Sequence, residues 1–449
     1  MKKLEIAYIG GGSRGWAWNL MNDLVIEGRL EGTVRLFDID HEASRINERI
    51  GNLYNSAVGA ATEWKYISVE TIDEALDGAD FVIISILPGT FDNMENDVHY
   101  PEKYGIYQAV GDTVGPGGIM RSVRAVPMYR DIAWKVRKIC PDAYIISYTN
   151  PMTVLTKTLF EVFPDIKAFG CCHEVFCVQR LVAGILELSG SERNVNRKEI
   201  ETNVLGINHF TWIDSMEYKG ESVMDIYKDF AEGHLESGYC EKGSWDDSFF
   251  TSGNRVKFDL MMKYGIAAAA GDRHLAEFCP DRYLRNPKTA ASWQFSLTPV
   301  SWRKKDRLER IKKAESLFKG EMKPVLSETG EEGVGLIKAL SGLSVEISNV
   351  NTINKGQHEG LPENCVVETN AEFSIDGIKP VYAGRLPAEV EKMVQKHVIN
   401  QENLVRACID ENRHGVQEVF LNDPMVSIRK DKAIKLFNEM FRLNSGFWE

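Results

Sequence analysis

The sequence lacks any long apolar run, and this absence excludes an integral membrane protein built from helices. No stretch approaches the roughly 18 consecutive apolar residues that a membrane-spanning helix needs. A strand-like segment begins at Leu4, directly after Met1-Lys2-Lys3, and leaves no room for the apolar region and cleavage site of a signal peptide. We therefore expect a cytoplasmic protein with no membrane partner.

An excess of positive charge is also missing. The chain carries 53 Lys and Arg against 65 Asp and Glu, a net charge of −12, and its pI is near 5.4. Binding to a nucleic-acid backbone depends on clustered Lys and Arg. A nucleic-acid partner is therefore disfavoured, whereas a small anionic substrate is compatible with a local group of arginines.

Cysteine is sparse and shows no disulfide framework. The eight cysteines are spread over 449 residues, so reduced thiols are expected. The adjacent Cys171 and Cys172 would form only a strained bridge. Repeats and low-complexity segments are absent too, and the 43% hydrophobic content is ordinary for a globular protein. Length alone suggests about three units, but the motifs below favour two domains, 1–190 and 191–449.

A glycine-rich turn follows the first predicted strand. Gly10, Gly12 and Gly15 satisfy G-x-G-x-x-G, with Ser13 between them, and a helical pattern runs from Trp16 to Glu27. Such glycines allow a tight turn and let the backbone approach a pyrophosphate at a helix N-terminus. The pattern predicts a dinucleotide-binding fold of the Rossmann type.

A second strand, 33–38, ends in an acid at the distance where this fold places one. Asp38 follows Gly15 by about 20 residues, where a carboxylate accepts hydrogen bonds from the adenine ribose. The same carboxylate repels a 2′-phosphate, so NAD is preferred over NADP. Asp38 as a simple turn residue at the strand end is the alternative.

Polar side chains follow several further strands. The apolar segments 79–87, 143–148 and 166–170 read as buried strands of a parallel sheet. Asn150 follows one of them, and Cys172 and His173 follow another. Because ligands of such sheets bind at the carboxyl ends of the strands, we expect these groups to meet at one crevice. The alternatives are that Asn150 only forms a turn and that the adjacent thiols are buried in the core.

Other candidates are less specific. The glycine-rich segment 105–118 contains one acid, Asp112, and precedes a helix with Arg121 and Arg124 near one face. A turn acid and a solvated helix face are the competing interpretations. His209 interrupts the strand-like run 203–212 and is compatible with a buried core residue. The region 301–323 is charged and helical and reads as a solvated surface.

Together these motifs resemble glycoside hydrolase family 4, the NAD- and metal-dependent glycosidases. The Cys-His-Glu-Val form at 172–175 resembles the α-galacturonidase subgroup. The segments that carry the resemblance are 10–15, 111–118, 149–151, 172–175, 206–209 and 271–274. It implies an α/β fold in which a Rossmann-type doubly wound domain is followed by an α+β domain like that of lactate and malate dehydrogenases.

The resemblance also implies a reaction. Galacturonic acid is released from α-galacturonides by NAD-assisted oxidation at C3, removal of the C2 proton, departure of the glycosidic oxygen and addition of water. The family is an exception to the two-carboxylate scheme of most glycosidases. A divalent metal, expected to be Mn²⁺, would polarise the C3 oxygen, although ligand softness alone favours zinc or iron for a thiolate site.

The resemblance assigns roles to individual residues. Cys172 and His209 are the implied metal ligands, and His173 is the implied proton donor. Asp272 is the first candidate for the C2 base and Tyr264 the second.

The substrate contacts are implied in part by the same resemblance. Asp112 and Asn150 match positions that contact the sugar. A uronate carboxylate calls for an arginine, and Arg273 is preferred over Arg121, Arg124 and Arg285 for its position beside Asp272. Glu174 has the wrong charge to face a uronate and is expected to meet a basic group or a sugar hydroxyl.

Three other functions stay open at this point. One is an α-glucuronidase or α-glucosidase of the same family, another is a lactate- or malate-type NAD-dependent dehydrogenase, and the last is an NAD-sensing binding protein. Chains of this size commonly form symmetric oligomers, so a homodimer or homotetramer is expected.

Overall fold

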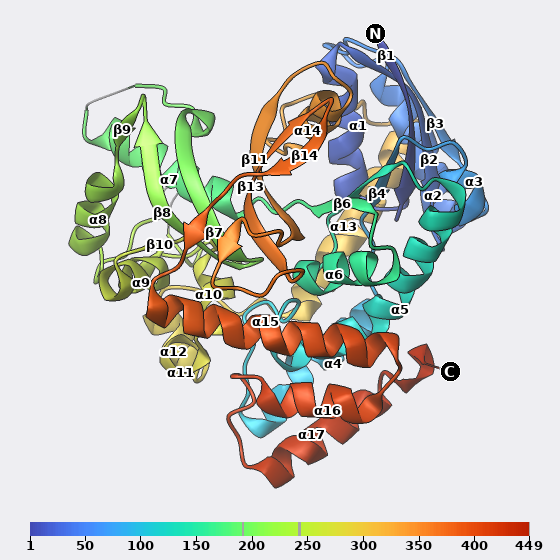
Figure 1. The fold of residues 1–449 in the computed structure, drawn as a ribbon. Helices are drawn as coiled ribbons and strands as arrows, with labels where there is room; N and C mark the ends of the chain where they lie inside the picture. The colour runs from blue at the N-terminus through green and yellow to red at the C-terminus, as the bar shows by residue number, and fades with distance from the viewer. Residues whose placement is uncertain (191–192, 241–243, 449) are drawn as a thin grey trace.

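The computed structural model describes residues 1–190, 193–240 and 244–448 (Figure 1). The boundary predicted between the two halves, at 190/191, touches residues 191–192, which lie outside the described residues. It stays a prediction.

Nine strands form the main sheet within the described residues. Their order is β14-β13-β11-β6-β5-β4-β1-β2-β3, and β1 to β6 are parallel, whereas β11 joins β6 in the antiparallel sense. The strands are β1 (Lys2–Ile9), β2 (Leu30–Phe37), β3 (Trp64–Ser68), β4 (Phe81–Ile84), β5 (Tyr144–Ser147), β6 (Lys167–Gly170), β11 (Glu346–Ile353), β13 (Val366–Ser374) and β14 (Gly377–Pro380). The second half of the chain therefore completes the sheet of the first.

Helices cover both faces of the sheet. Successive side chains of a strand point to opposite faces, so alternate residues of β1 pack against different helices. Ile6 and Tyr8 pack with α1, α2 and α14 on one face, while Ala7 and Ile9 pack toward α3, α5, α6 and α15 on the other. These helices are α1 (Trp16–Glu27), α2 (His41–Tyr54), α3 (Ile72–Leu76), α5 (Gly115–Ile139), α6 (Met152–Val162), α14 (Gly333–Leu340) and α15 (Ala388–Ile409). This doubly wound arrangement confirms the predicted Rossmann-type fold.

A smaller antiparallel sheet, a separate parallel pair of short strands and further helices make up the rest of the described structure. Figure 1 shows this sheet on the left and α15, α16 and α17 running below the main sheet. The remaining strands are β7 (Ile200–Ile207), β8 (Phe210–Tyr218), β9 (Glu221–Ser222), β10 (Ala267–Ala268), β12 (His358–Glu359) and β15 (Gly384–Arg385). The remaining helices are α4 (Phe91–His99), α7 (Glu174–Leu188), α8 (Met224–Gly233), α9 (Arg255–Tyr264), α10 (Asp272–Phe278), α11 (Pro280–Tyr283), α12 (Pro287–Ser292), α13 (Val300–Lys319), α16 (Arg413–Asn422) and α17 (Lys430–Arg442).

The register of the parallel strands aligns their carboxyl ends. Ile9 lies opposite Ile84, Ile84 opposite Ser147, and Ser147 opposite Gly170. The loops that follow β1, β4, β5 and β6 thus start at one edge of the sheet, as the sequence predicts. Among the described residues, no helix is both long and apolar enough to cross a membrane.

Candidate active site

The glycine-rich turn after β1 has the geometry of an anion-binding loop. Gly10 has a φ of 94°, and a Cβ added there would lie 2.0 Å from the carbonyl oxygen of Ser85, so only glycine fits. Helix α1 begins after Gly15 with no side-chain cap and no acid in its first turn. Its first N–H groups and the positive end of its dipole are therefore left for a phosphate.

Asp38 is tied to this loop. Its Oδ2 accepts a hydrogen bond from the backbone N–H of Gly12 at 2.8 Å, and the N–H of Ser13 donates to the carbonyl oxygen of Gly10 at 3.0 Å. Asp38 comes directly after the end of β2. The acid, the turn and the helix N-terminus form the arrangement that a dinucleotide needs, and the roles of Gly10, Gly12, Ser13, Gly15 and Asp38 stay predictions.

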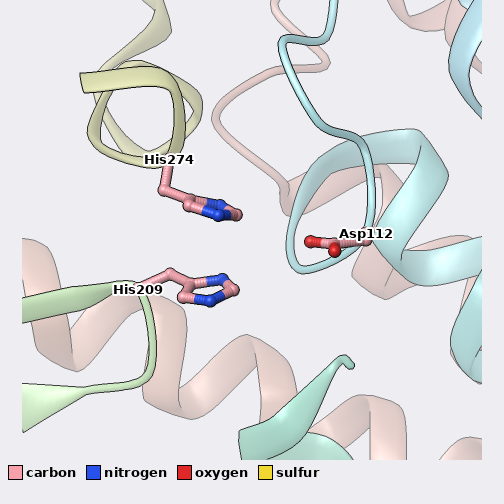
Figure 2. Close-up of side chains that lie close together, drawn as sticks. All are labelled: Asp112, His209 and His274. Carbon is pink, nitrogen blue, oxygen red and sulfur yellow. The ribbon is translucent and has the colours of Figure 1, made fainter. Parts of the chain in front are cut away.

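A second group of side chains comes from three separate elements. One ligand atom each of Asp112, His209 and His274 lies within 4.8 Å of the others. Figure 2 shows the two imidazoles stacked, with the Asp112 carboxylate pointing toward them; the ring centroids are 3.6 Å apart. Asp112 precedes α5, His209 lies in the turn between β7 and β8, and His274 lies on α10. Two imidazoles and a carboxylate are a donor set that divalent metals accept.

The tautomer of His209 leaves one nitrogen for a ligand. The Thr113 hydroxyl donates to Asp112 Oδ1 at 2.7 Å and also lies 2.8 Å from His209 Nδ1. Because the hydroxyl has a single proton, Nδ1 must be the donor to Thr113, and Nε2 then carries a lone pair. Burial and the nearby His274 lower the pKa of His209 to about 4, so the neutral, metal-binding form prevails at neutral pH.

His274 has an unsatisfied nitrogen. Its Nδ1 is buried and has no hydrogen-bond partner in the described part of the chain, while its Nε2 faces Glu174 Oε1 at 3.9 Å. A buried polar atom without a partner is costly, and an ion is one of its common explanations. The orphaned nitrogen and the donor set together make this cluster fit a metal ion.

Cys172 is near this cluster but is not part of the close group. Burial raises the pKa of the Cys172 thiol, and the negative charges of Glu368 and Glu174 raise it further. The same two carboxylates act on His209, so Cys172 and His209 share neighbours. The predicted ligand pair of Cys172 and His209 stays a prediction, and Asp112 and His274 are the donors that lie closest to His209.

Glu174 meets basic groups, as the sequence suggests. Its Oε2 accepts a hydrogen bond from the N–H of Gly271 at 2.7 Å. Burial raises the pKa of Glu174, but the charges of His274, His209 and His173 outweigh burial and lower it to about 2. Glu174 therefore links α7 to the start of α10 and fixes the position of His274.

His173 lies between the cofactor loop and the cluster. Its ring stacks on Trp16, the first residue of α1, with centroids 6.0 Å apart. Its Nδ1 lies 3.4 Å from Glu331 Oε1, and a hydrogen bond to this carboxylate raises the pKa of His173. With its side chain 43% exposed, His173 is accessible to a ligand. A partly exposed imidazole in this position can transfer a proton.

Asn150 and Asp112 contact each other. Asn150 Nδ2 donates to Asp112 Oδ2 at 3.1 Å, and Asn150 Oδ1 is buried without a partner among the described residues. Arg121 donates from Nε to the Asn150 carbonyl oxygen at 2.8 Å. Burial raises the pKa of Asp112, but His274, His209 and Arg121 together hold it well below its ordinary value. The two predicted substrate contacts are thus brought together beside the imidazoles.

Arg273 is largely occupied by the protein itself. It is 7% exposed and donates from Nε to the Ser296 carbonyl oxygen at 3.2 Å and from Nη2 to the Ala109 carbonyl oxygen at 2.7 Å, and it also contacts Thr298. These bonds hold the loop that leads to Asp112. Direct binding of a carboxylate by Arg273 stays a prediction.

Neither candidate for the C2 base contacts the cluster. Asp272 is fully buried, and its two oxygens accept hydrogen bonds from the N–H groups of Lys257 at 3.1 Å and Val256 at 3.3 Å, in the first turn of α9. Tyr264 donates to the sulfur of Met393 at 3.6 Å and packs against Trp212. The structure thus gives Asp272 a helix-capping position and Tyr264 a packing position. Their catalytic assignment stays a prediction.

Helix α13 contacts the glycine-rich loop and the surroundings of Arg273, which the sequence does not predict. Most of its side chains are exposed, as expected, but Arg310 donates to the Arg14 carbonyl oxygen at 3.3 Å in the cofactor loop. Near the other end, Arg303 lies over the ring of Phe250, which Arg273 also contacts. The sequence of α13 is rich in charged residues throughout, and this pattern does not distinguish Arg303 and Arg310 from a solvated helix face.

Comparison with known proteins is consistent with a nucleotide-binding fold that carries a candidate metal site. Residues 5–188 match the family described as Family 4 glycosyl hydrolase, and residues 204–426 match its C-terminal domain. A relative named alpha-galacturonidase, from Thermoanaerobacter italicus, is 55% identical over 98% of this chain and 96% of its own length.

Solved structures agree on the fold. The crystal structure of a Bacillus subtilis protein is 47% identical to this chain, with a TM-score of 0.94. The match covers 98% of this chain and 100% of the other. A 6-phospho-alpha-glucosidase from gut microorganisms, solved in complex with NAD and Mn²⁺, is 19% identical, with a TM-score of 0.81 and 99% of each chain covered. The chain belongs to the family 4 glycosyl hydrolases.

Proposed function

We propose that the protein is an α-galacturonidase that requires NAD⁺ and a divalent metal, with Mn²⁺ expected. The observation that carries this function is that the cluster of Asp112, His209 and His274 contacts Asn150 after β5 and so lies at the same sheet edge as the glycine-rich turn after β1. His173 stacks on Trp16 at the start of α1. The full-length relative named alpha-galacturonidase supports the choice of sugar.

The residues present fit both cofactors. The turn of Gly10, Gly12 and Gly15 would hold the pyrophosphate, and Asp38 the adenine ribose. His209 would hold the metal through Nε2, together with the predicted ligand Cys172 and the nearby donors of the cluster. When bound, NAD⁺ supplies an oxidant at C3 of the sugar, and the metal supplies a Lewis acid at the neighbouring oxygens.

The side chains of the chain itself perform the remaining tasks. Thr113 fixes the tautomer of His209. The amide oxygen of Asn150 has no partner among the described residues and can accept hydrogen bonds from sugar hydroxyls, as can the Asp112 carboxylate beside it. His173 is placed to donate a proton to the departing glycosidic oxygen. For the C2 proton, the sequence predicts Asp272 or Tyr264, but the backbone hydrogen bonds of Asp272 and the packing of Tyr264 favour structural roles for both.

A glycoside panel tests the function. The protein is assayed with 4-nitrophenyl α-galacturonide, α-glucuronide and α-glucoside, with NAD⁺, Mn²⁺ and a thiol reductant. We expect the α-galacturonide to be hydrolysed with the highest kcat/KM and with no net production of NADH. Preference for another glycoside would indicate the α-glucuronidase or α-glucosidase alternative. NADH formed in step with product would indicate a dehydrogenase.

The assembly and location are part of the same proposal. We expect a cytoplasmic homodimer or homotetramer acting on a small uronide, since symmetric oligomers are common among enzymes of this size. Light scattering coupled to size-exclusion chromatography measures the assembly directly.

A further inference from the structure

Three arginines from distant parts of the chain gather beside the Asp112 loop. Arg273 and Arg303 share one aromatic ring, because their guanidinium carbons lie 5.3 and 5.8 Å from the centroid of Phe250. Arg121 extends from α5 to the Asn150 carbonyl. Burial lowers the pKa of Arg121 and of Arg273, and the positive charge of Arg303 lowers both further. Arg303 is therefore close enough to repel both of the other arginines.

Arg303 is the one of the three that forms no hydrogen bond with the described protein. Within residues 1–190, 193–240 and 244–448, it has no hydrogen bond or ion pair to a carbonyl or carboxylate. Its neighbour Lys304, by contrast, pairs with Asp92 at 2.6 Å and with Glu95. Arg303 is half-buried in the first turn of α13, so this free cation is not simply a side chain extended into solvent.

The nearby acids act on Arg121 and Arg273, whose charges they stabilise, but within the described residues none of them forms an ion pair with Arg303. Asp112 faces the imidazoles and Asn150, and Glu174 faces His274 and Gly271. Burial raises the pKa of Glu277 to about 7, and its Oε1 accepts the N–H groups of Val110 and Gly111. Arg303 is thus a half-buried guanidinium that lies beside two other arginines and has no acidic partner of its own in the described protein. Its unused donors can bind an anionic ligand.

We propose that Arg303 binds the carboxylate of the uronosyl unit that is cleaved, while Arg273 and Arg121 position the surrounding loops. This assignment rests on the proposed function and names the residue that selects a uronide over a neutral glycoside. A planar guanidinium with unused donors can form two parallel hydrogen bonds to a carboxylate. Arg273 is less suited to this role, because backbone carbonyls already take its Nε and Nη2.

The test compares Arg303→Gln and Arg303→Lys with Arg307→Gln. Arg307 is an exposed arginine one turn further along α13 and serves as the matched control. The substrate is 4-nitrophenyl α-galacturonide, which carries a single carboxylate. We expect Arg303→Gln to raise KM and to lower kcat/KM by about 10- to 100-fold, with kcat changed less. Arg303→Lys should recover part of the loss, and Arg307→Gln should stay within about twofold of the wild type.

A binding measurement separates this assignment from a general effect on the site. Free galacturonate and free galactose are titrated into each holoprotein by calorimetry or as competitive inhibitors. Arg303→Gln should weaken galacturonate binding by about 10- to 100-fold and galactose binding by less than about threefold. Equal losses for both sugars, or an unchanged affinity for galacturonate, would overturn the assignment, as would a loss seen only with a digalacturonide, because the carboxylate would then belong to the leaving sugar.

The same experiment distinguishes failure of this inference from failure of the proposed function. If the wild-type protein hydrolyses no α-galacturonide, the function is wrong. If it does so and Arg303→Gln behaves like Arg307→Gln, the function stands and only the role of Arg303 is wrong. Unfolding temperatures of all variants should agree within about 2 °C, because Arg303 makes no polar contact with the described protein.

Discussion

Arg121 and Arg124 lie almost one turn apart on α5, yet their surroundings differ completely. Arg124 is 1% exposed and its donors are taken by Asp97, Asn444, the Pro88 carbonyl at 3.1 Å and the Met120 carbonyl at 3.2 Å. Arg121 is 8% exposed and has one acceptor, the Asn150 carbonyl, in the described chain. Folded proteins satisfy nearly all buried polar groups, so the fully used donors of Arg124 mark the framework, whereas Arg121 lies at the edge of the site and holds the loop of Asn150.

The acids beside these arginines differ in the same way. Burial raises the pKa of Asp97, and Arg124 offsets this only in part. Asp112 is also buried, but two imidazoles and Arg121 bring its pKa below the ordinary value. The Asp97 region stabilises the fold, whereas the surroundings of Asp112 keep its carboxylate ionised, and an ionised carboxylate can bind a metal cation. Substitutions on the two sides should therefore affect different measurements.

The largest expected effect is on the ligand side. His209→Ala should lower kcat/KM by about 10³-fold or more, because the metal loses a ligand that its Lewis-acid role requires. Mn²⁺ binding, followed by calorimetry or electron paramagnetic resonance, should weaken in parallel. The exposed His414 on α16 offers a control, and His414→Ala should change neither quantity. Normal Mn²⁺ affinity in His209→Ala would remove His209 from the metal site.

On the framework side, Asp97→Ala should destabilise the protein by about 3–5 kcal/mol, because it leaves Arg124 charged and buried without its partner. Urea unfolding measures this change. The folded fraction should keep kcat/KM within about threefold of the wild type. A stable Asp97→Ala protein with no activity would contradict the division between the two regions.

An intermediate effect is expected for Thr113→Val. This substitution removes the hydroxyl that fixes the His209 tautomer, and loss of such a partner typically weakens metal binding by about 10- to 100-fold. Calorimetry with Mn²⁺ gives the affinity, and thermal unfolding of the metal-free protein should change little. Thr113→Ser keeps the hydroxyl and should restore the affinity, unless the methyl group rather than the hydrogen bond is what matters.

The smallest effect is expected for Asp272→Asn. If Asp272 mainly holds the first turn of α9, as its two backbone hydrogen bonds indicate, the substitution should cost about 1–2 kcal/mol of stability and less than tenfold in kcat. Tyr264→Phe should be milder still. A loss of about 10³-fold in kcat for either variant, with normal stability, would identify that residue as the base after all.

The sequence predicted the nucleotide-binding half well, since each of its signals is local. The strand ending at Ile9, the glycine turn and the helix from Trp16 to Glu27 follow from neighbouring residues, and the structure reproduces them. The later strands β4, β5 and β6 were shorter than expected but occupied the expected places.

The rest could not be predicted, because it depends on which distant elements meet. His274 lies in a segment that carries the family resemblance, but nothing in the sequence indicates that its ring stacks on His209. Asp272 precedes His274 by two residues, yet a helix turns the two side chains in different directions. The arginines of α13 match a solvated helix by pattern, and only packing shows that Arg303 reaches the site.

The most direct test of the account is hydrolysis of 4-nitrophenyl α-galacturonide in deuterated water, with the released sugar analysed by nuclear magnetic resonance. If the glycine-rich turn and the metal cluster serve the same sugar, deuterium should enter at C2, no net NADH should accumulate, and removal of either NAD⁺ or the metal should stop the reaction. Hydrolysis that continues without both cofactors and leaves C2 free of deuterium would contradict it.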